Sequence, residues 1–219
     1  LDAVRAELEA GRQAYAERDA TLSDPRHVDV PVERLLSSQL AARLRGRIRP
    51  ERATADRATA GLPAHADTVY LCVVDKDRNV VSFINSLFEA FGSGIVASES
   101  GVLLQNRGFS FSLDPEHPNC IAPDKRPMHT IIPGMLTKGG KAVMPFGVMG
   151  GHYQAFGHAY LLTNIFEHGL DLQEAIDLPR LFPTLGGPVE VESGMPKGTV
   201  KGLKEFGHET QPAGKPIGG

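Results

Sequence analysis

The stretch from Ala66 to Gly94 constrains the fold of this chain more than any other. It contains two runs rich in β-branched and aromatic residues, Thr68 to Val74 and Asn79 to Phe88, on either side of the polar turn 75–78. Runs of this kind, bounded by Asp and Asn, predict a β-hairpin. Much of both runs is apolar, which is typical of strands that are covered on both faces. We therefore expect a buried hairpin with Thr68 at its start.

The segment before Thr68 has the opposite character. Residues Pro50 to Asp67 are rich in Ala, Thr, Arg and Asp, and Leu62 is their only large aliphatic residue. Such a segment buries too little apolar surface to order itself. It is either an ordinary linker between domains or a tail that is released when the bond between Asp67 and Thr68 is cut. A threonine that opens a buried strand directly after such a segment suggests a nucleophile exposed by chain cleavage.

Helices are predicted on the N-terminal side of this segment. Apolar residues at helical spacing make Leu1 to Leu22 an amphipathic helix. A second helix is expected to begin near Asp29, with Pro31 in its first turn, and to continue to Ile48.

Several further elements are predicted after the hairpin. A loop rich in Pro, with one Asn, runs from Leu113 to Pro127. The expected elements that follow are a hairpin of Thr130–Leu136 and Lys141–Phe146 around Gly139-Gly140, a helix over His152–His168, a short helix capped by Asp171, a strand over Val189–Val191 and a helix over Pro196–Phe206.

Composition excludes several classes of function. The 219 residues are 41% hydrophobic, which suits one domain with a sizeable core, and the net charge of -3 offers no basic footprint for nucleic acid. We expect no membrane span, because no apolar run approaches the roughly 20 residues that one needs. The cysteines Cys72 and Cys120 suggest no disulfide framework, and Cys72 is expected to be a small core residue. The histidines show no metal-binding spacing, so no metal site is expected. No other cofactor is expected either.

Several motifs together resemble the γ-glutamyltransferase family. Thr68 leads into Val73-Val74-Asp75-Lys76-Asp77-Arg78-Asn79, and further matches are Phe91-Gly92-Ser93-Gly94, Ser98-Glu99-Ser100-Gly101, Lys125-Arg126-Pro127 and Gly150-Gly151. Members of this family are N-terminal-nucleophile hydrolases, made as one precursor that cuts itself before a threonine. The resemblance implies an α+β fold, an αββα four-layer sandwich. It also implies that residues 1–67 are the helical end of a large subunit with a flexible linker, and that residues 68–219 are a small, catalytic subunit. Relative to the family we expect a fragment, with most of the large subunit outside it and the small subunit incomplete at its C-terminal end.

The resemblance also assigns the catalytic residues. Thr68 would be the nucleophile, and its freed α-amine, with a pKa of about 7.7 to 8.0, would accept the hydroxyl proton. Ser86 would be a second hydroxyl that hydrogen-bonds the nucleophile; the alternative is a strand serine that faces solvent. Gly150 and Gly151 would form the oxyanion hole, since N–H groups are free at the start of a helix; the alternative is a plain turn into a helix.

The substrate-binding positions depart from the family. Where the family grips the glutamate α-amine and α-carboxylate with Asn, Gln, Asp and a Ser-Ser pair, this chain has Phe88, Arg107, Ser110 and His129-Thr130. Asn106, beside Arg107, is a further candidate. The acidic partner for an ammonium group is missing and a cation has appeared, so the site suits a carboxylate without an adjacent ammonium, as in a glutaryl group. Arg107 is either a bidentate carboxylate clamp or a structural arginine, and His129 either donates to the substrate or braces its loop.

These patterns predict a self-processing N-terminal threonine hydrolase or transferase that acts on γ-glutamyl amides such as glutathione. One alternative is a glutaryl or cephalosporin-type acylase of the same fold, and another is a non-catalytic relative or an unprocessed precursor fragment. The expected partners are a small-molecule amide and the rest of the large subunit, without which the fragment would be inactive. A homodimer of processed heterodimers is compatible with the resemblance. Nucleic acid and membrane are not expected partners, and localisation is left open between cytoplasm and periplasm or exterior.

Overall fold

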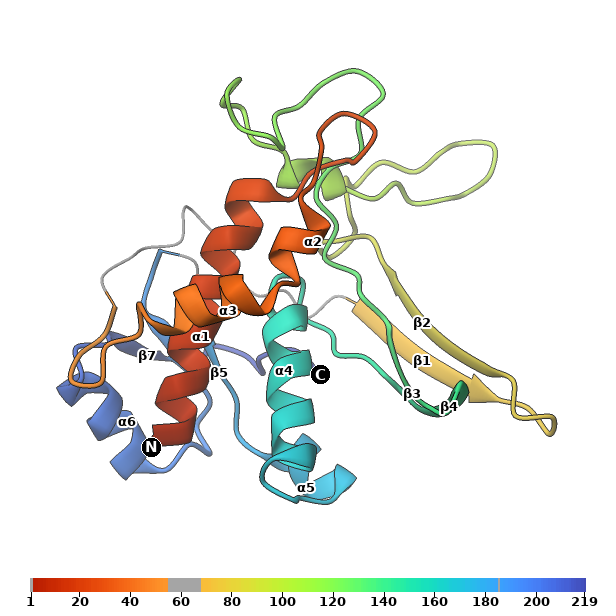
Figure 1. Cartoon of the computed structure of the whole chain (residues 1–219). Helices are drawn as coiled ribbons and strands as arrows, with labels where there is room; N and C mark the ends of the chain where they lie inside the picture. Colours follow the sequence, from red (N-terminus) through yellow and green to blue (C-terminus); the bar gives the residue numbers. More distant parts are fainter. Residues whose placement is uncertain (1, 55–67, 185) are drawn as a thin grey trace. The chain divides into compact units, whose positions relative to one another are not determined.

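The computed structural model describes residues 2–54, 68–184 and 186–219 (Figure 1). The chain divides into two compact units, each made of separated segments. The first comprises Leu1–Pro63, Gly108–Met128 and Pro179–Lys215, and the second comprises Ala64–Arg107, His129–Leu178 and Pro216–Gly219. The first unit thus combines segments from both sides of Thr68. The division into subunit parts 1–67 and 68–219 stays a prediction, and its boundary at Asp67 lies outside the described residues.

The first unit packs helices against a small sheet. Its helices are α1 (Asp2–Thr21), α2 (Val32–Leu35), α3 (Ser38–Arg45) and α6 (Lys197–Glu205), and its strands are β5 (Leu181–Pro183), β6 (Val189–Val191) and β7 (Thr210–Pro212). β6 is the central strand, antiparallel to β5 and parallel to β7. The apolar face of α1 contacts β5, where the ring of Tyr15 meets the ring of Phe182 edge-on at 6.1 Å between centres. Leu8, Phe182, Val189 and Leu203 are fully buried and form the centre of this unit.

The prediction of one continuous helix from Asp29 to Ile48 is wrong. The segment forms two helices, α2 and α3, because Ser37 is extended and its hydroxyl accepts the N–H of Leu40 as an N-cap of α3. A serine side chain that bonds its own backbone in this way competes with helix continuation.

The second unit contains two hairpins and a helix that follows a glycine turn. β1 (Thr68–Val74) pairs antiparallel with β2 (Val80–Ser86), as predicted, and the Asp75 carboxylate closes their turn by accepting the N–H groups of Asp77 and Asn79. β3 (Gly134–Lys138) pairs with β4 (Lys141–Phe146), which lies beside β2 (Figure 1). β3 begins later than predicted, at Gly134. The predicted helices are confirmed as α4 (Tyr153–Phe166) and α5 (Leu172–Asp177), and Asp171 forms a capping box with Glu174.

The first hairpin is covered on one face, not on both as the sequence predicted. Cross-strand neighbours Leu71 and Phe83 are exposed, as are Val73 and Val81, and all four lie on one face of the sheet. Ile84 on the opposite face is buried. The expected burial of Cys72 is also wrong, since it is exposed. The physical reason for the open face is that this sheet has only two strands, and among the described residues its packing partners lie on the face of Ile84. Cys72 lies on that same face but nearer the turn, where Val74 is exposed as well.

No helix among the described residues combines the length and apolar character needed to cross a bilayer.

Candidate active site

Thr68 and Ser86 meet at the open end of the first hairpin. The strand register puts them directly opposite each other, and the Thr68 hydroxyl donates a hydrogen bond to Ser86 Oγ at 3.1 Å. Ser86 Oγ also accepts the backbone N–H of Phe88 at 2.9 Å. Thr68 is buried, with 6% of its surface exposed. The orientation of the Thr68 hydroxyl is thus set by a side chain that is itself held by the next turn of backbone.

A buried arginine forms the next part of the site. Arg107 opens the 3-10 helix η1 (Arg107–Ser110), is 6% exposed, and donates from Nη1 to Thr130 Oγ1 at 2.9 Å. Its guanidinium carbon lies 4.9 Å from the centre of the Phe88 ring, a cation–π contact. Burial lowers the pKa of Arg107. Among the described residues no acceptor pairs with Arg107 Nη2, although that nitrogen is buried. A buried guanidinium with a donor to spare can bind a carboxylate.

Phe88 links the hydroxyl pair to the arginine. Its backbone is in the left-handed region, with φ 82°, which is costly for a residue with a large side chain. The Ser86 hydroxyl holds that backbone, and the ring then lies under Arg107 and edge-on to His152, 6.4 Å between ring centres. One continuous set of contacts therefore runs from Thr68 to Thr130.

Asn106 and His129 are engaged with their own loops. Asn106 accepts the N–H of Glu89 at 3.1 Å and donates to the Glu89 carboxylate at 3.3 Å. His129 Nδ1 accepts the N–H of Ile131 at 3.1 Å. Both side chains brace the backbone that carries other site residues, and their contact with substrate stays a prediction.

The glycine turn leads into α4 with two residues of positive φ. Gly150 has φ 122° and Gly151 has φ 58°, and a Cβ on Gly150 would lie 3.0 Å from Gly218 Cα. Within the described part of the chain no acceptor takes the N–H of either glycine. Free N–H groups at a helix start attract negative charge, which is what an oxyanion hole requires.

His152 has no role in the sequence-based prediction, yet it belongs to this region. It is 5% exposed, follows Gly151 directly and contacts the Phe88 ring, so the glycine turn is joined to the rest of the site. Its position next to the glycine pair was the only signal in the sequence. The described residues contain no group of three or more His, Cys, Asp or Glu side chains that could hold a metal ion.

Comparisons with known proteins agree with one another. A sequence model described as gamma-glutamyltranspeptidase matches residues 2–219. A glutathione hydrolase-like proenzyme of Bacillus subtilis is 39% identical over 212 residues, covering 94% of this chain and 40% of the relative. An oxamate amidohydrolase proenzyme of Klebsiella pneumoniae is 38% identical over 213 residues, covering 93% and 39%. The chain therefore spans about two fifths of the length of these relatives.

Solved structures are similar as well. A cephalosporin acylase from Bacillus halodurans matches 98% of this chain and 39% of its own, with a TM-score of 0.87 and 40% identity. A gamma-glutamyltranspeptidase from Pseudomonas nitroreducens matches 68% of this chain and 84% of its own, with a TM-score of 0.63 and 26% identity. These likenesses confirm the predicted α+β fold of the N-terminal-nucleophile hydrolase type.

Proposed function

Because the chain belongs to the gamma-glutamyltranspeptidase family, we propose that it carries the nucleophile of a self-processing enzyme that hydrolyses or transfers γ-glutamyl amides. Thr68 is that nucleophile, exposed when the bond between Asp67 and Thr68 is cut. The observation that carries the proposal is the hydrogen bond from Thr68 Oγ1 to Ser86 Oγ at 3.1 Å, with Thr68 at the first position of β1.

The proposed reaction has two steps. The α-amine of the processed Thr68 takes the hydroxyl proton, and Thr68 Oγ1 attacks the carbonyl carbon of the amide. Ser86 keeps the hydroxyl oriented, and the N–H groups of Gly150 and Gly151 stabilise the tetrahedral oxyanion. The proton then passes to the departing amine, which leaves an ester on Thr68. Water or an acceptor amine attacks that ester in the second step, returns a proton to Thr68 Oγ1 and releases the product.

A second candidate is an acylase that takes amides of dicarboxylic acids, such as glutaryl amides. The unpaired Nη2 of Arg107 favours it, because this donor suits a terminal carboxylate while its charge repels an α-ammonium group. The carboxylate of Glu89 is engaged by Asn106. Two relatives point the same way: an oxamate amidohydrolase and a cephalosporin acylase are named for amide substrates other than glutathione.

The first test concerns self-processing of the full-length protein. We expect two polypeptides on a denaturing gel, with Thr68 at the N-terminus of the smaller one. Thr68→Ala should remain a single polypeptide because it lacks the attacking hydroxyl. Thr137→Ala, which alters an exposed threonine of β3, is the matched control and should split normally.

Two results would overturn the proposed function. One is a wild-type protein that stays intact under conditions in which it is folded, which would favour an unprocessed or non-catalytic relative. The other is a Thr68→Ala variant that splits at the same bond.

A further inference from the structure

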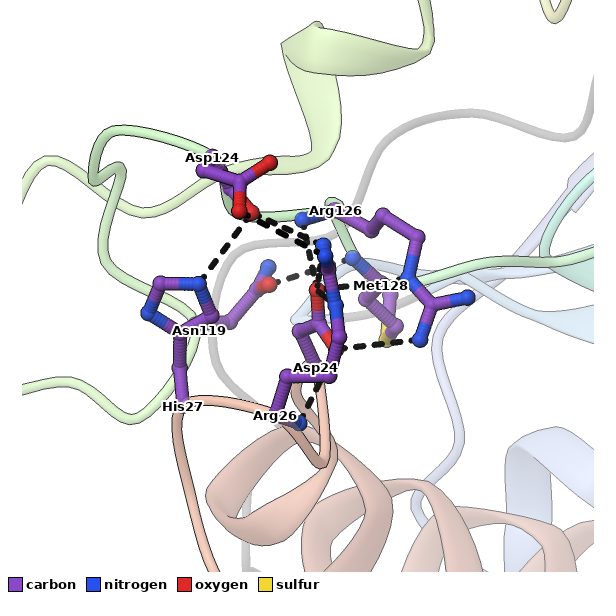
Figure 2. Close-up of polar contacts among 7 residues, drawn as sticks. All are labelled: Asp24, Arg26, His27, Asn119, Asp124, Arg126 and Met128. Carbon is purple, nitrogen blue, oxygen red and sulfur yellow. Dashed lines mark hydrogen bonds and ion pairs between the residues drawn. The ribbon is translucent and has the colours of Figure 1, made fainter.

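The carboxylate of Asp24 is the centre of a charged cluster in the first unit (Figure 2). Its side chain is inaccessible to solvent, whereas those of Arg26 and Arg126 are 48% and 65% exposed. Arg126 donates from Nε at 3.2 Å and from Nη2 at 3.0 Å, and its backbone N–H donates at 2.9 Å. Arg26 adds a bond from Nη2 at 2.9 Å. Hydrogen bonds from Arg126 and then from Arg26 hold the pKa of Asp24 well below its usual range.

This cluster joins segments that are remote in sequence. Asp24 follows α1, on the N-terminal side of Thr68, and Arg126 lies in the loop 108–128 on the other side. The same two segments meet again where Ser23 Oγ donates to the Pro118 carbonyl at 2.6 Å and where Arg26 donates to the Asp124 carbonyl at 2.8 Å. A cut before Thr68 would leave no covalent path between them, so these contacts would then connect two polypeptides.

The loop 108–128 is also closed from within. Asn119, which is buried, donates to the Ser110 carbonyl at 2.7 Å. It also accepts the N–H of Met128 at 3.1 Å (Figure 2). The two ends of the loop are thereby held together. Along the chain those ends continue into Arg107 and Thr130, which share the hydrogen bond of 2.9 Å described above.

We propose that Asp24 is a positioning residue: its carboxylate, contributed from the N-terminal side of the cut, fixes the loop 108–128 and through the loop's ends keeps Arg107 and Thr130 in place for a substrate carboxylate. This inference rests on the proposed function for its effect on substrate binding. Its structural part, the fixing of the loop, is independent of that function. A negative charge is required, because an amide at this position would turn a donor toward one of the two guanidinium groups.

The test compares Asp24→Asn with Asp124→Asn in the full-length protein. Asp124 is the matched control, because it belongs to the same cluster but its side chain is 90% exposed. Its ion pair in the cluster joins Asp124 Oδ2 to Arg26 Nη1 at 3.5 Å. The first readout is trypsin cleavage after Lys125, followed by mass spectrometry. We expect Asp24→Asn to speed this cleavage roughly tenfold or more, since loss of a charged partner raises the population of the open loop. Asp124→Asn should match the wild type.

The second readout is the kinetics of the processed enzyme with glutaryl anilide and γ-glutamyl anilide. For Asp24→Asn we expect KM to rise roughly fivefold to tenfold for the better substrate while kcat changes less than about threefold, because Asp24 does not touch the reacting atoms. A merely structural role would lower the amount of active enzyme and hence kcat, with KM unchanged. Arg126→Lys keeps the charge and the backbone N–H but loses the pair of guanidinium donors that bond Asp24. It should give a smaller change in the same direction. It also serves if Asp24→Asn fails to fold.

Each result decides the matter. The inference is overturned if trypsin cleaves Asp24→Asn at the same rate as wild type. If only Arg126→Lys folds, the same comparison is made with that variant. Faster nicking with an unchanged KM overturns the positioning of Arg107 and Thr130. A wild-type chain that never splits before Thr68 overturns the proposed function instead, and the trypsin comparison still tests the loop.

Discussion

Replacing Arg107 by glutamine would remove the buried positive charge of the candidate site while keeping a side chain that can still donate to Thr130. We expect the variant to fold, because among the described residues the Arg107 side chain makes one hydrogen bond, with Thr130, and one ring contact, with Phe88. The kcat/KM for glutaryl anilide should fall, whereas that for γ-glutamyl anilide should fall less. The difference arises because the arginine attracts the terminal carboxylate in both substrates but repels the α-ammonium group of the second.

The size of the loss follows from the geometry. Arg107 Nη1 is held by Thr130, so Nη2 is the donor that the structure leaves for the substrate. A hydrogen bond to a charged partner contributes about 1.5–3 kcal/mol, and each tenfold in rate corresponds to about 1.4 kcal/mol, so kcat/KM for glutaryl anilide should drop roughly 10- to 150-fold. Arg107→Lys should lie between wild type and Arg107→Gln, because it keeps the charge but loses the fork.

The assay measures release of aniline from matched anilides by wild type, Arg107→Gln and Arg107→Lys. Arg47→Ala, which changes an exposed arginine in the other unit, controls for a general effect of lost charge. Equal losses with the two anilides, or none with glutaryl anilide, refute this reasoning. If wild type prefers γ-glutamyl anilide by tenfold or more, the second candidate function is wrong, and Glu89→Gln would then show whether Glu89 receives the ammonium group.

Two further predictions concern single side chains. Ser86→Ala should slow acylation on the order of 10- to 1000-fold, as for other positioned hydrogen bonds in a transition state, with the melting temperature nearly unchanged; an unchanged single-turnover rate would return Ser86 to a structural role. Burial raises the pKa of Glu7 from 4.5 to about 7, and its Oε1 is buried with no hydrogen-bond partner among the described residues. Because the folded-state pKa is the higher one, the folded state binds the extra proton, and stability should fall as pH rises from about 4.5 to about 7 and then level off. Glu7→Gln should therefore raise the melting temperature at pH 8 but not at pH 4, and equal shifts at both pH values would contradict the assigned cause.

The sequence by itself determined the elements that depend on neighbouring residues. The apolar spacing of α1, the β-branched runs of β1 and β2 and the carboxylate turn at Asp75 are local signals, and each gave the observed element to within about two residues. The exact register of this hairpin was not determined in the same way. A turn at 75–78 would place Thr68 opposite Asn85, whereas the structure pairs Val74 with Val80 and so places Thr68 opposite Ser86.

Tertiary structure alone decided the remainder. β5 and β7 have three residues each, too few to show a periodicity in the sequence. They form because β6 pairs with both. The residues next to Arg107 in sequence could not show which of its guanidinium donors would find a hydrogen-bond acceptor. Its partner Thr130 comes from a different segment, and among the described residues Nη2 has no acceptor. Asp24 reaches Arg126 across 102 positions. A carboxylate has the same local signature whether it faces water or two arginines, so its environment is decided by the packing of distant segments and not by the sequence around it.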